Sequence, residues 1–334
     1  MASSRHRGPL EIAEGFYLSH IVYHLHRRNV LERLGGATTT AELADEYGYD
    51  PDLLGALLEF VRQRTDLLNR DISGRYSLNP AYVPYRRFGF HLDKLIGAYG
   101  PPLERLEESL RSPTLGRELV DRGMLAQAFC GLEAGGAGPA AQIIRDWNVS
   151  SLLDLGCGPG TLLLELASAD SGFRGWGVDA NAHVCAAAAE RVASAGLAEA
   201  VRVIHADVRE LGTHLDSHAR GQIEALHGGS VLNEFFGSGA SDAVDFVESL
   251  RGLFPGRLLF VSDYYGKLGV RRRVKAAHMH TLLQDVAQMV SEQGVPPPDL
   301  AGWAEIYEDA GSTLVHAYEG DHGGISWFIH VVRL

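Results

Sequence analysis

The sequence has few cysteines and no hydrophobic run long enough to cross a membrane. Its 334 residues include 3 cysteines, Cys130, Cys157 and Cys185, which lack the spacing of a metal site. Such thiols are typical of a reducing intracellular compartment. No stretch approaches the roughly 18 apolar residues of a membrane-spanning helix, and no apolar signal region follows Met1. We therefore expect a cytoplasmic protein without a membrane partner.

Positive charge is also scarce in most of the chain. The net charge is −12. Residues 1–115 contain 14 Lys and Arg against 15 Asp and Glu, whereas residues 116–334 contain 16 against 27. Because the phosphates of nucleic acids are bound by positive surfaces, this balance argues against a nucleic-acid partner. The length allows two hydrophobic cores, and we predict two domains, residues 1–115 and 116–334.

The N-terminal domain is predicted to be mainly helical. An amphipathic pattern predicts one helix over residues 11–34. Thr39 and Glu42 form a capping-box pair that begins a second helix, and the Asp50–Pro51 pair begins a third. A hairpin is predicted between residues 67 and 78. Helices followed by a hairpin are the layout of a winged-helix domain.

The most informative stretch is a glycine-rich turn between a predicted strand and a predicted helix. The apolar run at residues 152–155 is typical of a buried strand. Gly156, Gly158 and Gly160 follow in G-x-G-x-G spacing, and an apolar helical pattern starts at Thr161. Glycine permits a tight turn and a close approach of the backbone to a ligand. The stretch therefore predicts a ligand site at the start of the helix.

Each of the next two predicted strands ends near an acidic residue. Asp179 lies about 20 residues beyond the glycines, a distance that suits hydrogen bonds to ribose hydroxyls. Asp207 follows the third strand, where its carboxylate can accept from an adenine amino group. Gly160 comes one residue too early for the dinucleotide fingerprint, and no Lys follows it as in a phosphate loop. A cofactor that contains adenosine but no phosphate fits best.

These motifs resemble those of the class I S-adenosylmethionine (SAM)-dependent methyltransferases. Residues 154–160 match their first motif, residues 177–179 the second and residues 205–208 the third. The resemblance implies an α/β fold, a Rossmann-like seven-stranded SAM-methyltransferase domain with a mainly helical, winged-helix-like N-terminal domain. It also implies SAM as the cofactor, with the glycine turn facing its methionine part. The cofactor-binding residues are then Asp154, Gly156, Gly158, Gly160, Asp179, Ala180, Asp207, Val208 and Asn233.

The remaining segments are predicted to complete the sheet. In an open α/β sheet the ligand binds beyond the carboxyl ends of the strands, so side chains at those ends are candidate site residues. The predicted elements are strand four within residues 223–232, a helix over 241–254, strand five over 257–262, a helical insert over 271–293, and a final antiparallel pair over 313–318 and 325–332.

Methyl transfer from a sulfonium needs few catalytic groups. It is a single displacement that depends mainly on in-line placement, and a base matters only where the acceptor starts protonated. Glu234 can instead cap the next helix, and the aromatic side chains can instead pack in the core. The candidate catalytic residues are Glu234, Asn233 and Tyr264, and the candidate substrate contacts at the strand ends are Phe235, Phe236 and Tyr265.

Tyr17 and His20 share one face of the first predicted helix. They contact substrate if this helix covers the pocket of its own or a partner subunit, and otherwise they are interface residues. Many small-molecule methyltransferases use a similar N-terminal domain to dimerise and to cover the active site, so the resemblance implies a homodimer. The would-be recognition helix contains Asp52 and Glu59, which argues against DNA binding.

No metal ion is expected. His278 and His280 are two residues apart and point in opposite directions if they are helical. The C-terminal half is also similar, more loosely, to C-methyltransferases that act on α-keto acids. Some of these hold iron on histidines, one of which lies just after strand four. Residues 233–238 contain no histidine, which argues against both the iron and a keto-acid substrate.

We therefore predict a homodimeric SAM-dependent methyltransferase acting on a small molecule, either a secondary metabolite or an amino or keto acid. One alternative keeps SAM but cyclises or transfers its aminocarboxypropyl arm and releases methylthioadenosine. A ligand-sensing winged-helix regulator is the third interpretation.

Overall fold

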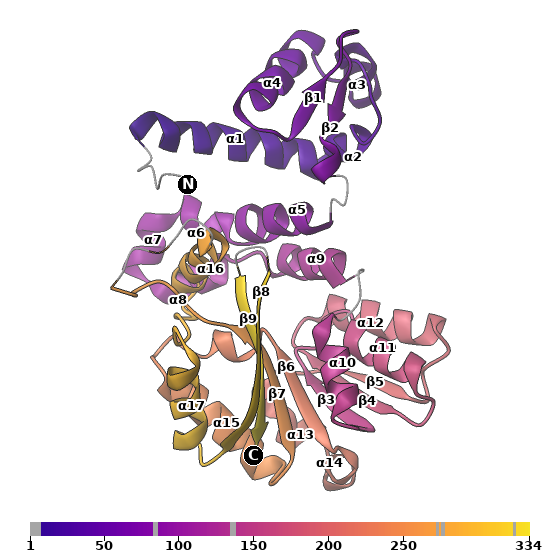
Figure 1. Cartoon of the computed structure of the whole chain (residues 1–334), viewed down its shortest axis with the longest axis vertical. Coiled ribbons are helices and arrows are strands. Elements are labelled where there is room, and N and C mark those ends of the chain that lie inside the picture. Colours follow the sequence, from indigo (N-terminus) through magenta and orange to yellow (C-terminus); the bar gives the residue numbers. More distant parts are fainter. Residues whose placement is uncertain (1–7, 83–85, 134–137, 272–273, 275–277, 323–324) are drawn as a thin grey trace. The chain divides into compact units, whose positions relative to one another are not determined.

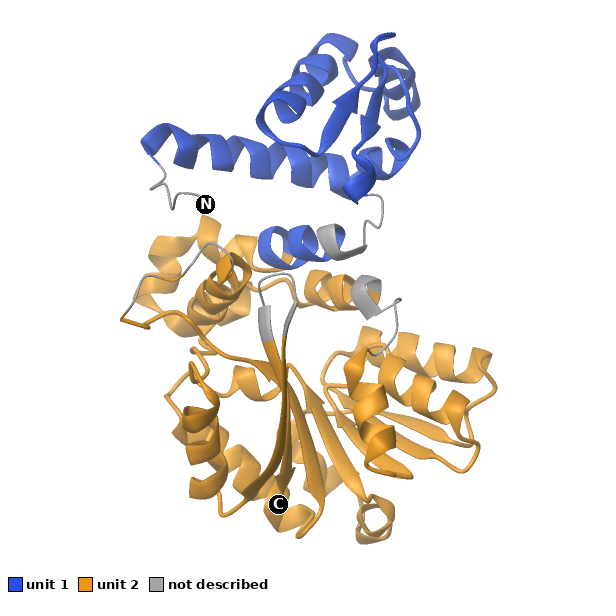
Figure 2. Cartoon of the chain, viewed as in Figure 1, with its two compact units in different colours: residues 1–97 blue, residues 98–334 orange. Residues whose placement is uncertain are grey.

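The computed structural model describes residues 8–82, 86–133, 138–271, 274, 278–322 and 325–334. The chain divides into two compact units, Met1–Gly97 and Ala98–Leu334, which Figure 2 colours separately. Each unit is described by itself.

The smaller unit is mainly helical. Its core gathers leucines from several helices, among them Leu25, Leu31, Leu43 and Leu58. The predicted mainly helical N-terminal part is confirmed. Its elements are α1 (Pro9–Arg27), α2 (Val30–Arg33), α3 (Thr40–Tyr47), α4 (Pro51–Arg64), β1 (Leu68–Arg70), β2 (Tyr76–Leu78), η1 (Pro80–Tyr82) and α5 (Arg86–His91), followed by η2 (Leu92–Ala98), which ends at the first residue of the second unit.

The predicted helix starts in this unit agree with the structure, but the first helix is shorter than predicted. Thr39 accepts from the backbone N–H of Glu42, whose carboxylate accepts from the N–H of Thr39. The Asp50 carboxylate caps α4 by accepting from the N–H of Leu53. The single helix predicted over residues 11–34 is wrong, because Asn29 adopts a left-handed backbone (φ 59°) and separates α1 from α2.

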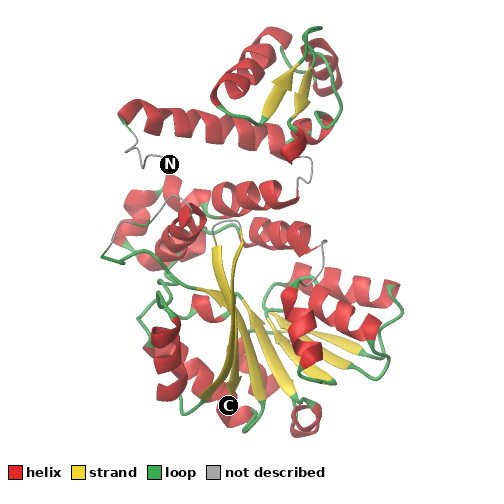
Figure 3. Ribbon diagram, in the orientation of Figure 1, coloured by secondary structure: helices red, strands yellow, loops and turns green. Residues whose placement is uncertain are grey.

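The larger unit is built on a seven-stranded sheet with the order β5-β4-β3-β6-β7-β9-β8. The first five strands of the unit are parallel, whereas β9 is antiparallel to both of its neighbours. Figure 3 shows these strands in yellow between red helices. The predicted fold class is confirmed. The strands are β3 (Ser151–Leu155), β4 (Arg174–Asp179), β5 (Val201–His205), β6 (Ala225–Gly229), β7 (Leu258–Tyr264), β8 (Thr313–His322) and β9 (Ile325–Arg333).

Two hydrophobic clusters cover the two faces of this sheet. Successive residues of β3 point to opposite faces, so Leu152 joins one cluster and Leu153 the other. The first cluster includes α10 (Pro139–Asp146), α11 (Thr161–Ala169) and α12 (Ala182–Ser194) (Figure 1). The second includes α13 (Leu211–His214), α15 (Ser241–Leu253) and α17 (Leu300–Asp309). Both faces are therefore buried, as a parallel sheet requires.

The larger unit begins earlier than the predicted boundary at residue 115. Two short helices before this point and a third that spans it belong to the larger unit. The second and third pack against α16, and the first packs against the other two. A side chain at Gly116 would come within 2.1 Å of the carbonyl oxygen of Val290, and the Thr114 hydroxyl donates to Glu292 over 3.1 Å. These elements are α6 (Gly100–Glu104), α7 (Leu106–Arg111), α8 (Pro113–Leu119) and α16 (Met279–Val290).

Of the helical insert predicted over residues 271–293, the structure describes α16 in the second part. Residues 272–273 and 275–277 lie outside the described residues. The other elements of the unit are α9 (Arg122–Glu133), α14 (Ser217–Gln222) and the single turns η3 (Val208–Glu210) and η4 (Leu232–Glu234). In the described part of the chain, no helix combines the length and the apolar character needed to span a membrane.

Candidate functional site

A cavity of about 960 Å³ lies at the carboxyl edge of the parallel strands. The described residues that line it belong to the larger unit. The turns after β3, β4, β5 and β6 all reach it, as expected for an open α/β sheet. Among the predicted site residues, those that line the cavity are Gly156, Gly158, Asp179, Ala180, Asp207, Val208, Glu234 and Phe235.

The glycine turn after β3 brings bare backbone to this cavity. Gly156 and Gly158 both have left-handed backbones, with φ of 62° and 53°, which glycine adopts without strain. A side chain on Gly156 would also come within 2.7 Å of Val231 Cγ2. Gly160, with φ 74°, begins α11 and does not line the cavity. The first two glycines thus shape the site, and the third forms the helix start behind it.

Asp179 fixes the turn and faces the cavity. One of its carboxylate oxygens accepts from the N–H of Gly158 over 3.1 Å, and the other from the N–H of Asn181 over 2.8 Å. Burial raises the pKa of Asp179, while these two hydrogen bonds oppose the shift. A carboxylate has about four acceptor positions, so two remain for donors of a ligand.

Asp207 and Arg209 form the next part of the wall. The Asp207 carboxylate accepts from the N–H of Arg209 at the start of η3 and pairs with its guanidinium over 3.5 Å. That guanidinium lies 4.3 Å from the centre of the Phe235 ring. Phe235 in turn stacks on Phe246 of α15, with ring centres 4.1 Å apart. The Phe235 ring therefore packs against both Arg209 and Phe246.

Glu234 lies in the cavity at the end of η4. Its side chain is 42% accessible, and its carboxylate lies 4.0 Å from the guanidinium of Arg122. The surrounding protein raises the pKa of Glu234 by desolvation, and the charges of Arg122, Arg209 and Arg117 act against this. The alternative of a helix cap fails, because α15 begins after Ala240.

Four predicted site residues at and just beyond the ends of β6 and β7 do not line the cavity, and their side chains pack in the core. Asn233 donates from its backbone and its side chain to the Asp263 carboxylate and accepts from Gln288. The Tyr264 hydroxyl contacts Asp285 and Gln288 at 3.0 and 2.7 Å, and burial raises its pKa strongly.

Tyr265 and Phe236 are the other two. Tyr265 donates to Glu319 and contacts His330, whereas Phe236 packs edge-on against Trp303. All four side chains are buried. These side chains lie behind the cavity wall, and their predicted contacts with ligand stay a prediction.

Asp154 is also buried behind the cavity. Its carboxylate binds Nδ1 of His227 over 2.7 Å, and Nε2 of this ring lies 2.9 Å from the Ser262 hydroxyl. His227 and Ser262 line the cavity, although the sequence analysis missed both. A histidine within the short apolar strand around residues 225–229 was the available signal.

Tyr17 and His20 belong to the smaller unit. Both are exposed on α1, where the ring of Phe16 contacts each of them. Their predicted contact with substrate stays a prediction. In the described residues no group of three or more His, Cys, Asp or Glu could hold a metal ion.

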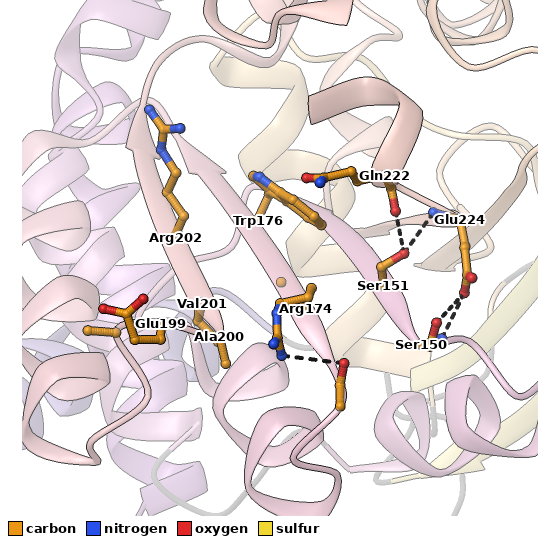
Figure 4. A pocket seen from close by; sticks show the side chains of 13 residues that line it. Ser150, Ser151, Arg174, Trp176, Glu199, Ala200, Val201, Arg202, Gln222 and Glu224 are labelled. Atoms are coloured by element: carbon orange, nitrogen blue, oxygen red, sulfur yellow. Dashed lines mark hydrogen bonds between the residues drawn. The ribbon is translucent and has the colours of Figure 1, made fainter. Parts of the chain in front are cut away.

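A second cavity, of about 710 Å³, lies at the opposite, amino edge of the sheet (Figure 4). Glu224 accepts there from the backbone and the hydroxyl of Ser150. Arg174 donates to nearby backbone carbonyls. None of the predicted site residues lines this cavity, so the carboxyl edge remains the candidate active site.

Comparisons with known proteins agree with this site. Residues 152–222 match a family model described as a methyltransferase domain. The 2-ketoarginine methyltransferase of Streptomyces arginensis is 26% identical over 175 residues, which is 51% of this chain. The match spans 50% of that relative, about half of its length.

Solved structures with this fold cover nearly the whole chain. The mitomycin 7-O-methyltransferase MmcR has a TM-score of 0.74 at 19% identity, covering 97% of this chain and 96% of its own. PigF with SAH has a TM-score of 0.74 at 16% identity, covering 97% and 98%. The neocarzinostatin-biosynthesis O-methyltransferase NcsB1, in complex with SAM and a naphthoic acid, has a TM-score of 0.69 at 18% identity, covering 98% and 99%.

The fold is that of these solved methyltransferase structures. The chain carries a methyltransferase domain within this fold, so the resemblance seen in the sequence is confirmed.

Proposed function

We propose that this protein is a SAM-dependent methyltransferase that acts on a small molecule. One observation carries the proposal. The carboxyl ends of three adjacent parallel strands, β3, β4 and β5, bring a bare glycine turn and two carboxylates to a single cavity of about 960 Å³.

The residues of this cavity fit an adenosine cofactor. Asp179 has free acceptor positions for the two ribose hydroxyls, and Asp207 and Val208 lie one strand farther out, where the adenine would bind. Gly156 and Gly158 line the cavity without side chains, which leaves room for the amino-acid part. When bound, SAM would supply a methyl group on a positively charged sulfur. That sulfur becomes a neutral thioether when the methyl group is transferred, so its departure needs no acid.

Glu234 is the group best placed to act on the acceptor. Desolvation raises its pKa, and a carboxylate of raised pKa is a stronger base near neutral pH. It can therefore orient an acceptor hydroxyl or remove its proton. The lining side chains Phe235, Phe129 and Leu125 give the same cavity apolar surface for the body of a small molecule.

Relatives support the substrate class. The matched proteins are named for 2-ketoarginine and mitomycin, and NcsB1 is bound to a naphthoic acid. We therefore propose a secondary metabolite, or an amino or keto acid, as the acceptor.

Product analysis tests this proposal. The protein is incubated with SAM and a panel of phenolic and keto-acid acceptors, and its nucleoside products are separated by liquid chromatography with mass detection. Methyl transfer gives S-adenosylhomocysteine (SAH) and an acceptor heavier by one methylene. Release of methylthioadenosine alone would instead identify the aminocarboxypropyl chemistry, and absence of SAM binding would reject both.

For the smaller unit we propose a winged-helix-like dimerisation role in a cytoplasmic homodimer. Two capped helices, α3 and α4, precede the antiparallel β1–β2 hairpin. Apolar side chains of α1 are exposed at Leu10, Ile12 and Phe16, which a partner subunit would cover.

A further inference from the structure

A relay of three hydrogen-bonded side chains forms part of the cavity wall. Asp154, His227 and Ser262 come from the neighbouring strands β3, β6 and β7. Nδ1 of His227 lies 2.7 Å from the Asp154 carboxylate, and Nε2 lies 2.9 Å from the Ser262 hydroxyl. Asp154 is buried, while His227 and Ser262 reach the cavity. The relay thus connects a buried carboxyl group to the surface of the site.

An ionised Asp154 carboxylate beside a neutral His227 ring sets the direction of both hydrogen bonds. An ionised carboxylate can only accept, so Nδ1 of His227 carries the hydrogen that it donates to Asp154. In the neutral ring, Nε2 is then an acceptor, and the Ser262 hydroxyl donates to it. The Ser262 hydrogen is therefore directed toward the histidine. On the side of the cavity, Ser262 Oγ can therefore accept a hydrogen bond but cannot donate one.

We propose that Ser262 Oγ is a binding site for the positively charged part of the cofactor. The inference rests on the proposed use of SAM, which carries two cationic groups, the α-ammonium and the sulfonium. An oxygen that accepts but does not donate favours either group over an anion. The neighbouring lining residues Gly156, Gly229 and Ser230 place this oxygen on the side of the glycine turn. His227 and Asp154 act as positioning residues, since they orient the hydroxyl.

Three nucleosides separate the two cationic groups. SAM has both, SAH has only the ammonium, and 5′-methylthioadenosine has neither. Their dissociation constants are measured by calorimetry at neutral pH for the wild type and for Ser262→Ala. We expect the variant to bind SAM about tenfold or more weakly, the loss typical of a hydrogen bond to a charged group, and to bind 5′-methylthioadenosine unchanged.

The SAH result identifies the group. An equal loss for SAH assigns the contact to the ammonium, and a loss for SAM alone assigns it to the sulfonium. The inference is overturned if all three ligands weaken equally, or if none does. If the wild type binds none of the three ligands, the proposed cofactor is rejected together with this inference. If the wild type binds them and Ser262→Ala changes all three affinities equally or not at all, the inference alone is rejected.

Two further variants serve as checks. Ser249→Ala removes a hydroxyl that donates to the Phe246 carbonyl in α15, away from the cavity lining, and should bind all three ligands as the wild type does. His227→Phe keeps a ring but removes Nε2, so the Ser262 hydroxyl can rotate and donate into the cavity. It should show the same selective loss, with thermal unfolding measured to verify its fold. If this variant fails to fold, Ser262→Ala decides.

Discussion

Asp179 shows how one residue both builds the site and serves it. Its two hydrogen bonds to Gly158 and Asn181 hold the turn, and its remaining lone pairs face the cavity. Replacing Asp179 with Ala removes the charge-assisted bonds expected to the ribose, each worth about 1.5–3 kcal/mol. We expect SAM affinity, measured by calorimetry, to fall between about tenfold and several hundredfold.

A matched variant tests whether losing a hydrogen bond that holds a backbone turn is enough to weaken SAM binding. Asp170 also accepts from a backbone N–H, that of Gly172, in an exposed turn that does not line the cavity. Asp170→Ala should leave SAM affinity unchanged. Native affinity in a correctly folded Asp179→Ala variant would mean that the carboxylate does not bind the ribose.

At Glu234, the effect of the side-chain charge on turnover can be separated from the effect of side-chain size. Glu234→Gln keeps the size of the side chain but removes its basicity. If Glu234 activates the acceptor, turnover should fall about 10²-fold or more with SAM affinity nearly intact. Because desolvation raises its pKa, wild-type turnover should decline as acidic pH protonates it, and this decline should be absent in the variant.

The control for Glu234 lies on α15. Glu248 is exposed and pairs only loosely with Arg251, over 3.8 Å. Glu248→Gln should therefore turn over as the wild type does. Full activity of Glu234→Gln would show that Glu234 does not activate the acceptor. The cavity would then promote methyl transfer by positioning the acceptor.

Elements that follow a single strong pattern could be predicted from the sequence. The apolar run before the glycines became β3, and the capping pair Thr39 and Glu42 became the start of α3. The break at Asn29 was missed, because the apolar spacing continues across it and only the left-handed backbone ends the helix.

Side-chain direction was harder to predict than strand position. The strand ends were located correctly, yet Asn233 and Tyr264 point into a buried polar network around Asp263, Asp285 and Gln288. Those partners lie far away in the sequence, so no local spacing shows that the polar atoms are already engaged. The same holds for Asp154, whose partner His227 comes from another strand.

The antiparallel strand β9 carries a buried histidine whose protonation opposes folding. His330 lies between Tyr265 and Tyr307, with ring nitrogens 3.2 and 3.0 Å from their hydroxyls. Burial lowers the pKa of His330 to about 3, whereas the unfolded ring titrates near 6.5. The contribution of His330 to the free energy of unfolding is therefore fully present above about pH 6.5. It is lost as the pH drops toward 3, because over this range only the unfolded state binds the proton.

Denaturant unfolding measures this effect. Between pH 7.5 and pH 5, His330 should account for a loss of about 2 kcal/mol in the free energy of unfolding. His330→Gln can still form hydrogen bonds but does not titrate, so its stability should fall by that much less over the same interval. Parallel pH curves for the two proteins would show that the buried ring is not the source.

At the scale of the whole molecule, we propose that the two units have separate tasks. Among the described residues, those that line the candidate active site belong to the larger unit. The smaller unit has its own core, and the apolar side chains exposed on α1 do not contribute to that core. Ile12 is 63% exposed and Phe16 is 62% exposed. Apolar area of this kind is stabilised when another surface covers it.

We expect the intact chain to be a dimer that uses this face of α1. A charge at the centre of the face should oppose its burial, so Phe16→Glu should shift the molar mass measured by light scattering after gel filtration from dimer toward monomer. Ile72, fully exposed beside the β1–β2 turn, provides the control, because Ile72→Glu adds the same charge elsewhere on the unit and should remain dimeric. A wild-type protein that elutes as a monomer at micromolar concentration would contradict the dimer, and a dimer unaffected by Phe16→Glu would place the interface on another surface.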